Sequence, residues 1–256
     1  MAIQFIEENI MSNKKPVHPK KKNYILLLRF VLFLLFFFIS YSIGLYCIAE
    51  DKLEIKGKLF PVHTQSSQVI TEEMVDLIVE ACDQSLPQEI DNQLFNSKIG
   101  CYYLEKGIFA PTSIKDTNVL MAFNKILKPG IRFLDLGSGD GRVVFLASLF
   151  GAASTGIEFD EDIFNSSLKA RDKLSNRFDL SKTELIRGDF FDSDFSRYDV
   201  FYYFMSGSFD EKRLEEKLAK ELKPEAILLG YIEHEAFKEL LSVGRIGERI
   251  TIYKKR

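Results

Sequence analysis

A run of glycines behind an acidic residue is the part of this chain best suited to binding a small ligand. Asp135 follows the apolar run 131–134 and is followed by Gly137, Gly139 and Gly141. Glycine has no Cβ and accepts positive φ angles at little cost, so such a turn brings bare backbone against a ligand. A carboxylate directly before the turn suits a ligand that carries an ammonium group or another hydrogen-bond donor.

The spacing of these glycines indicates whether the turn suits a dinucleotide cofactor. A dinucleotide-binding turn has the pattern G-x-G-x-x-G, in which the third glycine packs the helix against the strand and the pyrophosphate lies at the helix N-terminus. Here that third position is Arg142, and the glycines run G-x-G-x-G. The carboxylate of Asp135 would also repel a pyrophosphate. The turn therefore disfavours a dinucleotide.

Two further acids follow at the ends of the next predicted strands. Glu158 lies 23 residues after Asp135 and ends a short apolar run. An acid about 20 residues beyond such a turn is where a carboxylate holds ribose hydroxyls. Asp189, with Phe190 beside it, follows the next run, 184–188. Because the carboxyl ends of parallel strands meet at one edge of a sheet, the three acids predict a single pocket.

The elements that would position these acids alternate between strand and helix. The sequence predicts an α/β fold, doubly wound, with a mostly parallel sheet and helices on both faces. Only 25 residues follow Tyr231, so we expect the last two strands to be abbreviated or partly absent. The predicted strands are 131–136, 154–158, 183–188, 198–204, 225–232 and a segment around 249–254, and the predicted helices are 140–150, 160–176 and 209–222.

The N-terminal part of the chain has a different character. Residues 30–49 are 20 successive uncharged residues, and at about 1.5 Å per residue a helix of that length spans roughly 30 Å, the hydrocarbon thickness of a bilayer. A cleavable signal peptide usually has an apolar block of only about 7–15 residues. We therefore predict a basic, disordered tail over 1–23, one transmembrane helix over 24–49 and a linker over 50–70.

A helical segment is expected between this linker and the core domain at 131–256. Within the range 71–130, Thr71 is a candidate N-cap for a first helix, with acidic residues in its first turn. Ser113 is the candidate N-cap of a second helix that runs to Leu127, where Pro129 and Gly130 end it.

Charge and composition exclude other classes of function. Residues 1–29 carry six basic and two acidic groups, or +4, which leaves −7 for residues 30–256 out of the total of −3. An acidic core domain is a poor match for a phosphate backbone, so no nucleic-acid substrate is expected. The three cysteines and three histidines show no metal-ligand spacing, so no metal is expected either.

The string Asp135-Leu-Gly-Ser-Gly-Asp-Gly141 resembles the first motif of class I, seven-strand S-adenosylmethionine-dependent methyltransferases. In that family the glycine turn lies beside the methionine part of the cofactor. The acid that matches Glu158 holds the ribose, and the acid that matches Asp189 binds the adenine amino group. The resemblance implies S-adenosyl-L-methionine as cofactor, a Rossmann-like sheet, and the cofactor-binding residues Asp135, Gly137, Ser138, Gly139, Gly141, Glu158, Asp189 and Phe190.

A narrower resemblance concerns the acceptor of the methyl group. One N-terminal span, Ala110-Pro111-Thr112 before the pre-core helix, and the G-S-G-D-G-R string are similar to membrane-anchored lysine methyltransferases of mitochondria, which modify inner-membrane proteins. This resemblance implies a membrane-associated protein substrate and makes Pro111 and Thr112 candidate site residues. Tyr203 and Phe204, at the end of the fourth strand, are candidates for an aromatic mouth around the acceptor.

Two other functions remain open, and so does the membrane topology. The chain could methylate a small or lipid-like acceptor, or it could be a non-catalytic, cofactor-binding scaffold. The excess of lysine before residue 30 would keep the N-terminus inside and place the core domain outside. Because S-adenosylmethionine is kept in the cytoplasm or the mitochondrial matrix, we expect the core domain on the side that contains this cofactor.

Overall fold

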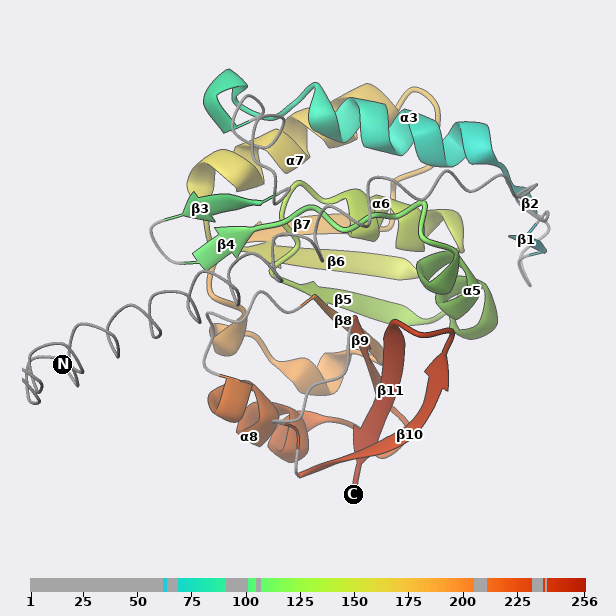
Figure 1. Cartoon of the computed structure of the whole chain (residues 1–256), viewed down its shortest axis with the longest axis vertical. Helices are drawn as coiled ribbons and strands as arrows, with labels where there is room; N and C mark the ends of the chain where they lie inside the picture. The colour runs from blue at the N-terminus through green and yellow to red at the C-terminus, as the bar shows by residue number, and fades with distance from the viewer. Residues whose placement is uncertain are drawn as a thin grey trace, which may run out of the picture. The chain divides into compact units, whose positions relative to one another are not determined.

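A seven-stranded sheet with the strand order β10-β11-β9-β8-β5-β6-β7 forms the centre of the fold (Figure 1). β11 (Ile250–Lys255) pairs antiparallel with β9, and β10 (Leu240–Ile246) pairs antiparallel with β11. The sheet confirms the predicted α/β fold with mostly parallel strands. Its parallel strands are β5 (Arg132–Leu136), β6 (Ala153–Glu158), β7 (Thr183–Arg187), β8 (Val200–Phe204) and β9 (Ile227–Tyr231).

The structure, a computed structural model, describes residues 62–63, 69–90, 101–104, 107–204, 211–231, 237 and 239–256. All of these belong to one unit, Lys52–Arg256. The predicted tail 1–23 and transmembrane helix 24–49 lie outside the described residues. Within the described part of the chain, no helix combines the length and the hydropathy needed to span a bilayer.

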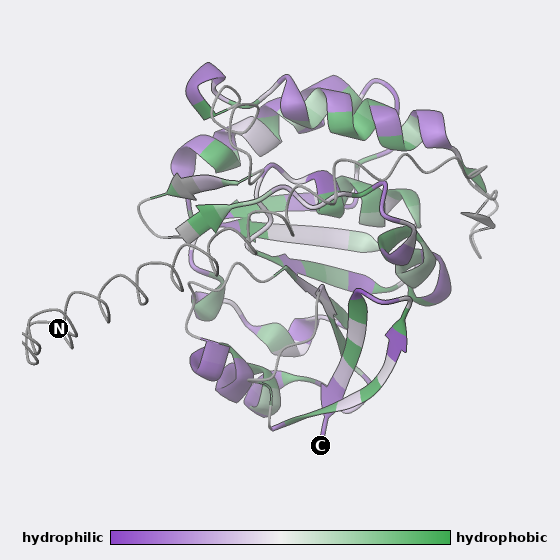
Figure 2. Cartoon of the chain, in the orientation of Figure 1, coloured by the Kyte–Doolittle hydropathy of each residue, from purple (hydrophilic) through white to green (hydrophobic). Residues whose placement is uncertain are grey.

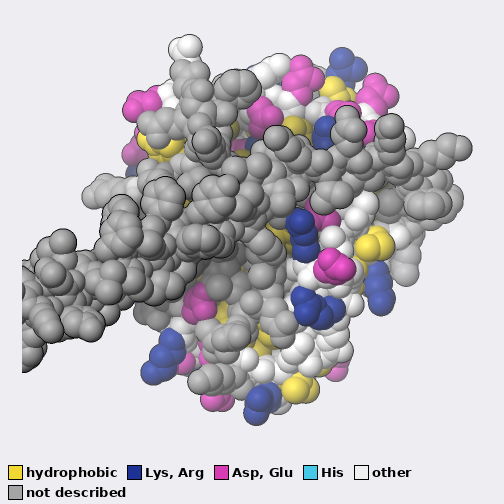
Figure 3. All heavy atoms as spheres, viewed as in Figure 1, with side chains coloured by type: hydrophobic (Ala, Val, Ile, Leu, Met, Phe, Trp, Pro, Cys, Tyr) yellow, Lys and Arg dark blue, Asp and Glu magenta, His cyan; other side chains and the backbone are white. Residues whose placement is uncertain are grey.

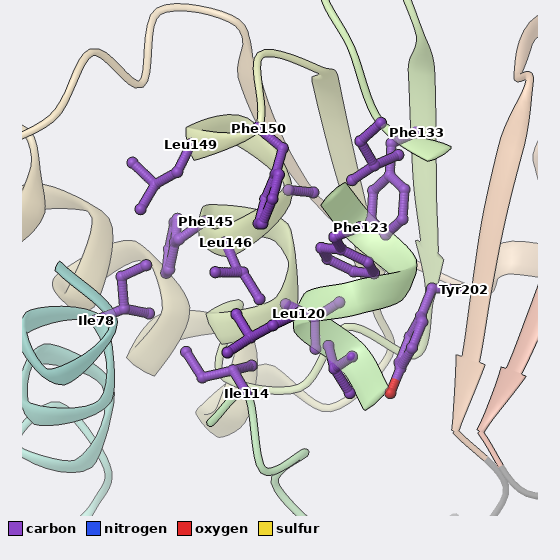
Figure 4. Close-up of a cluster of buried hydrophobic side chains, with 14 of the residues drawn as sticks. Ile78, Ile114, Leu120, Phe123, Phe133, Phe145, Leu146, Leu149, Phe150 and Tyr202 are labelled. Atoms are coloured by element: carbon purple, nitrogen blue, oxygen red, sulfur yellow. The ribbon is translucent and has the colours of Figure 1, made fainter. Parts of the chain in front are cut away.

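Buried side chains lie on both faces of the sheet, as two clusters that alternate along each strand. On β8, Tyr202 belongs to the cluster that packs under α6 (Arg142–Leu149) and α7 (Glu161–Leu174), whereas Tyr203 belongs to the cluster under α8 (Glu211–Glu221). Figure 4 shows the first cluster, with Tyr202 at one end of it. α8 is hydrophilic over most of its surface (Figure 2). Helices therefore cover both faces, as predicted.

The pre-core segment, residues 71–130, is not helical throughout. It contains α3 (Glu72–Asp83) and α5 (Thr117–Ile126), but also a hairpin of β3 (Tyr102–Leu104) and β4 (Gly107–Phe109). Thr71 caps α3 as predicted, since its hydroxyl accepts a hydrogen bond from the N–H of Met74. Two short strands, β1 (Val62–His63) and β2 (Val69–Ile70), pair in the segment predicted as a linker.

The second pre-core helix begins later than predicted. Its N-cap is Asp116 rather than Ser113, and the carboxylate accepts a hydrogen bond from the N–H of Asn118 at 2.8 Å. The other carboxylate oxygen accepts from the hydroxyl of Tyr231 at 2.9 Å and faces Arg249 at 3.5 Å. These long-range contacts fix the cap at Asp116.

The prediction for the C-terminus was wrong, because both terminal strands are present in full. β10 spans seven residues and β11 spans six. Only residues 232–239 separate β9 from β10, so the 25 residues after Tyr231 suffice for a complete hairpin. The turn of this hairpin contacts the start of α5, where the N–H of Glu248 donates to Oδ1 of Asn118 at 3.2 Å.

Candidate functional site

The strand order reverses between β5 and β8, and a cavity of about 160 Å³ opens at their carboxyl ends. In doubly wound sheets, ligands bind at this point because the crossovers on either side leave opposite faces of the sheet. Asp135 of β5 and Tyr202 of β8 are register partners here. The two side chains are 3% and 1% exposed. The cavity therefore lies where the predicted site was expected.

Most of the predicted site residues come together in this cavity. The glycine turn supplies one wall, the segment after β4 supplies another, and the end of β8 supplies a third. Gly141 and Asp189 do not line it. The predicted residues that do are Pro111, Thr112, Asp135, Gly137, Ser138, Gly139, Glu158, Phe190, Tyr203 and Phe204.

The three glycines of the turn have positive φ angles but different surroundings. A Cβ on Gly137, at φ 78°, would have no atom within 4 Å. A Cβ on Gly139, at φ 55°, would lie 2.9 Å from the ring of Phe109, so the β3–β4 hairpin covers this part of the turn. A Cβ on Gly141 would meet the ring of Phe145 at 2.9 Å. Gly141 thus permits close packing around α6, whereas Gly137 leaves open space.

Asp135 is a buried carboxylate without a hydrogen-bond or ion-pair partner among the described residues. Burial raises its pKa well above the usual value, and the nearby charges of Glu158 and Asp140 raise it further. A buried carboxylate costs free energy unless a cation or donor compensates for its lost hydration. The Asp135 carboxylate is therefore suited to bind a cationic group.

Glu158 connects the end of β6 to the glycine turn. Its Oε2 accepts from the N–H of Gly139 at 2.8 Å, and its Oε1 accepts from the N–H of Asp160 at 2.8 Å. Burial raises the pKa of Glu158, although these two hydrogen bonds act in the opposite direction. Each carboxylate oxygen has a second lone pair that can still accept a hydrogen bond from a ligand.

An ion-pair cluster at the turn was not predicted. Arg142 bonds Asp140 through Nε at 3.0 Å and Asp83 of α3 through Nη2 at 2.7 Å. Next to Asp83, the Cys82 thiol donates to the carbonyl of Asp140 at 3.6 Å. The only sequence signal for this cluster was the charged pair within the glycine motif, because nothing local points to Asp83.

Gly156 is a second residue that sequence reasoning missed. It lies in the middle of β6, where an added Cβ would be 2.6 Å from Val144 Cγ2 and 2.7 Å from Ser138 Cβ. The turn and the start of α6 can therefore lie directly on β6. The signal was available, since an isolated glycine inside an apolar strand indicates a close approach of another segment.

Asp189 lies at the same edge of the sheet but outside the cavity lining. Its carboxylate accepts from the N–H of Phe191 at 2.9 Å and begins the short helix η1 (Phe190–Asp192). Phe190 lines the cavity, and so does Phe159, which follows Glu158 and is 45% exposed. Aromatic rings therefore border the cavity near two of the three predicted acids.

Part of the chain matches a family model of methyltransferases. Residues 135–231 match the family model described as the ANTKMT methyltransferase domain. This range runs from Asp135 to the last residue of β9. None of the curated proteins matches the chain.

Several solved structures are similar to this chain. An RNA methyltransferase from Salinibacter ruber in complex with S-adenosyl-L-homocysteine is 26% identical, with 57% of this chain and 92% of that chain covered and a TM-score of 0.45. The putative methyltransferase yhhF from Escherichia coli is 14% identical, with 61% and 99% covered and a TM-score of 0.46. An MtNAS mutant in complex with S-adenosylmethionine is 14% identical, with 71% and 73% covered and a TM-score of 0.47.

Proposed function

We propose that this chain, which is a class I S-adenosylmethionine-dependent methyltransferase, transfers methyl groups to lysine side chains of a membrane-associated protein. The match to the ANTKMT methyltransferase domain supports a lysine acceptor, and it covers the glycine turn, Glu158 and the end of β8. The observation that carries the proposal is the cavity at the reversal point of the sheet, where carboxylates and aromatic rings meet.

The residues of the cavity fit the cofactor. Asp135 has no partner among the described residues and suits the ammonium of the amino-acid part. Glu158 keeps lone pairs that suit ribose hydroxyls, and Phe190 offers a ring for the purine. The open space at Gly137 leaves room for a ligand against the backbone. When bound, S-adenosylmethionine supplies an electrophilic methyl group on a positively charged sulfur.

The protein contributes mainly alignment and the exclusion of water. Attack of a neutral amine on a sulfonium methyl is a direct displacement, and holding the reactants in line can supply roughly 7–11 kcal/mol of the barrier. The acceptor lysine must first lose its proton, and a desolvated surrounding favours the neutral amine. The rings that line the cavity, which are those of Phe109, Phe159, Phe190, Tyr202, Tyr203 and Phe204, provide such a surrounding.

Tyr203 and Phe204 are proposed to border the acceptor. The ring of Phe204 lies 5.1 Å from the ring of Tyr231, and this contact positions Phe204 at the carboxyl end of β8. Burial raises the pKa of Tyr203, and the charge of Glu211 raises it further, so the hydroxyl stays protonated at neutral pH and does not act as a base. Aromatic faces also attract the methylated ammonium product.

The N-terminal segment supports a substrate at a membrane. The uncharged residues 30–49 are long enough to form a membrane anchor. An anchor would confine the enzyme to the membrane surface and raise the effective concentration of acceptors in that membrane. On the face in Figure 3, basic and acidic side chains are interspersed over the described residues, unlike the single-sign surface that binds a phosphate backbone.

The proposal is tested with the full chain in detergent, native membranes and methyl-labelled S-adenosylmethionine. We expect the label to migrate with a protein band and to be recovered as methyl-lysine after hydrolysis. Label in the organic extract would indicate a lipid-like acceptor instead. Cofactor binding without any transfer would indicate a scaffold.

A matched pair of variants makes this experiment specific. Gly139→Val places a side chain at a positive φ angle against Phe109, and should abolish labelling. Gly244→Val lies on β10, where an added Cβ has no atom within 4 Å, and should label like the parent chain.

A further inference from the structure

Five of the six backbone N–H groups of residues 137–142 are hydrogen-bonded within the described protein, and only that of Asp140 is not. A carboxylate on a bound ligand therefore needs hydrogen-bond donors besides those of the turn. The bonds are Gly137 and Ser138 N–H to the Ile157 carbonyl at 3.0 Å each, Gly139 N–H to Glu158 at 2.8 Å, Gly141 N–H to the Ser138 carbonyl at 2.9 Å and Arg142 N–H to Asp140 at 3.2 Å.

Tyr202 is a buried donor at the cavity without such a bond. Its side chain is 1% exposed and lines the cavity, and its hydroxyl has no hydrogen-bond partner among the described residues. Figure 4 shows Tyr202 at one end of the apolar cluster, with the hydroxyl oxygen at the far end of the ring. Buried polar groups in native proteins are nearly always hydrogen-bonded, so an exception at a cavity wall indicates a ligand.

The surroundings of this hydroxyl indicate the chemistry of the ligand. Burial keeps the pKa of Tyr202 well above its usual value, so the hydroxyl is protonated and can donate. The side chain of Thr112 is near enough to interact with this hydroxyl, and that contact acts to lower the pKa of Tyr202. Thr112 also lines the same cavity. Asp135, the register partner of Tyr202, is an acceptor without a donor. An acid and two hydroxyls side by side complement a group that carries both an ammonium and a carboxylate.

We propose that the hydroxyls of Tyr202 and Thr112 donate hydrogen bonds to the carboxylate of the cofactor's amino-acid part, while Asp135 binds its ammonium. The end of β8 and the segment after β4, rather than the glycine turn, would then hold the carboxylate. The inference rests on the proposed use of this cavity for S-adenosylmethionine. It makes Tyr202 a binding residue, distinct from its neighbours Tyr203 and Phe204 at the acceptor side.

Calorimetry with two ligands tests this inference. The first ligand is S-adenosylmethionine, and the second is its decarboxylated analogue, which lacks only the carboxylate. Tyr202→Phe should weaken binding of the first by about 10- to 150-fold, the usual strength of a hydrogen bond to a charged group. Binding of the analogue should stay within about twofold of the parent chain. Thr112→Val should show the same selectivity.

Tyr198→Phe is the matched control, because this tyrosine is buried but lies outside the cavity lining. It should bind both ligands as the parent chain does. Within the described protein, Tyr202→Phe removes only the weak contact of the hydroxyl with Thr112, so its melting temperature should fall little.

Three results would overturn the inference. An equal loss of affinity for both ligands would show that the Tyr202 hydroxyl does not contact the carboxylate. Unchanged binding of S-adenosylmethionine together with a raised KM for the acceptor would move Tyr202 to the acceptor side. If the parent chain binds neither ligand, the proposed function itself fails, which is a different result from a loss confined to the variant.

Discussion

Arg142 and Asp83 join the glycine turn to a helix that lies 59 residues earlier in the chain, through a contact of 2.7 Å. The guanidinium is 8% exposed and also bonds Asp140, whose side chain is 1% exposed. The position of the turn therefore depends on α3, which lies outside the residues that match the methyltransferase domain model.

Arg142 should contribute much more to folding stability than Asp83 does. Arg142→Leu leaves Asp140 buried and unpaired, which typically costs about 3–5 kcal/mol of folding stability. Asp83 is half exposed, so Asp83→Asn should cost at most about 1 kcal/mol. Urea denaturation measures both changes, and equal losses for the two variants would contradict this account.

Asp83→Asn should nevertheless weaken cofactor binding by a few-fold, since Arg142 loses its contact with α3. The control is Asp76→Asn on the same helix, where Asp76 pairs with Lys115 at the surface. Calorimetry should show cofactor affinity unchanged in that control. A similar loss in both variants would mean that α3 acts through its general stability.

Gly156→Ala should displace the glycine turn, because the new methyl group would lie between β6 and Ser138. Its Cβ would lie 2.6 Å from Val144 Cγ2 and 2.7 Å from Ser138 Cβ, and such overpacking typically costs about 1–3 kcal/mol. Cofactor affinity should fall as well, because Ser138 belongs to the turn. Thermal melting and calorimetry check the two effects, with Gly244→Ala as the open-space control. A stable Gly156→Ala with full affinity would show that the turn can shift freely.

Binding of the cofactor should release protons. Burial raises the pKa of Asp135 above 3.8, so the free protein holds a proton there at pH values where the unfolded chain has lost it. Stability of the free protein should therefore fall as pH rises through that window. A cationic ligand favours the ionised carboxylate, so affinity should rise with pH. Calorimetry in two buffers of different ionisation enthalpy measures the release.

Asp135→Asn should reduce this proton release, with a remainder from Glu158, whose pKa is also raised. Cofactor affinity should fall too, because the neutral amide attracts an ammonium less strongly. Proton uptake on binding, or a release unchanged in Asp135→Asn, would show that the Asp135 carboxylate does not face the ligand's positive charge.

Glu158→Gln should weaken cofactor binding by about 10- to 150-fold if the carboxylate accepts ribose hydroxyls. The amide oxygen can still accept one of the two backbone N–H groups that Glu158 now binds. Glu161→Gln is the matched control, because Glu161 is exposed and pairs with Arg187 at the surface. If Glu158→Gln binds as tightly as the parent chain, the proposed ribose contact is wrong.

The parallel part of the sheet was predictable because short strand patterns alternate with helical patterns along the chain. The choice of cap for α5 was not, since Ser113 and Asp116 are both good N-caps. Contacts of Asp116 with Tyr231 and Arg249, more than 100 positions away, decide it. The sequence around Ser113 and Asp116 does not indicate these long-range contacts.

Only part of the candidate site could be predicted from the sequence. The position of Asp135 and Glu158 at one cavity could be predicted, because strand ends meet at one edge of a parallel sheet. The roles along β8 could not, since the run 201–204 is aromatic throughout and shows no alternation of polar and apolar residues. Register alone places Tyr202 opposite Asp135 and turns Tyr203 to the other face.

The contact between the terminal hairpin and α5 has a consequence for synthesis of the protein. The N–H of Glu248 bonds the side chain of Asn118, 130 positions earlier. Non-local contacts of this kind form late, because a long loop must close before they contribute. On the ribosome, the contact with Asn118 can form only after Glu248 has emerged, whereas Phe123 of α5 packs on Phe133 and Tyr202, which are made earlier.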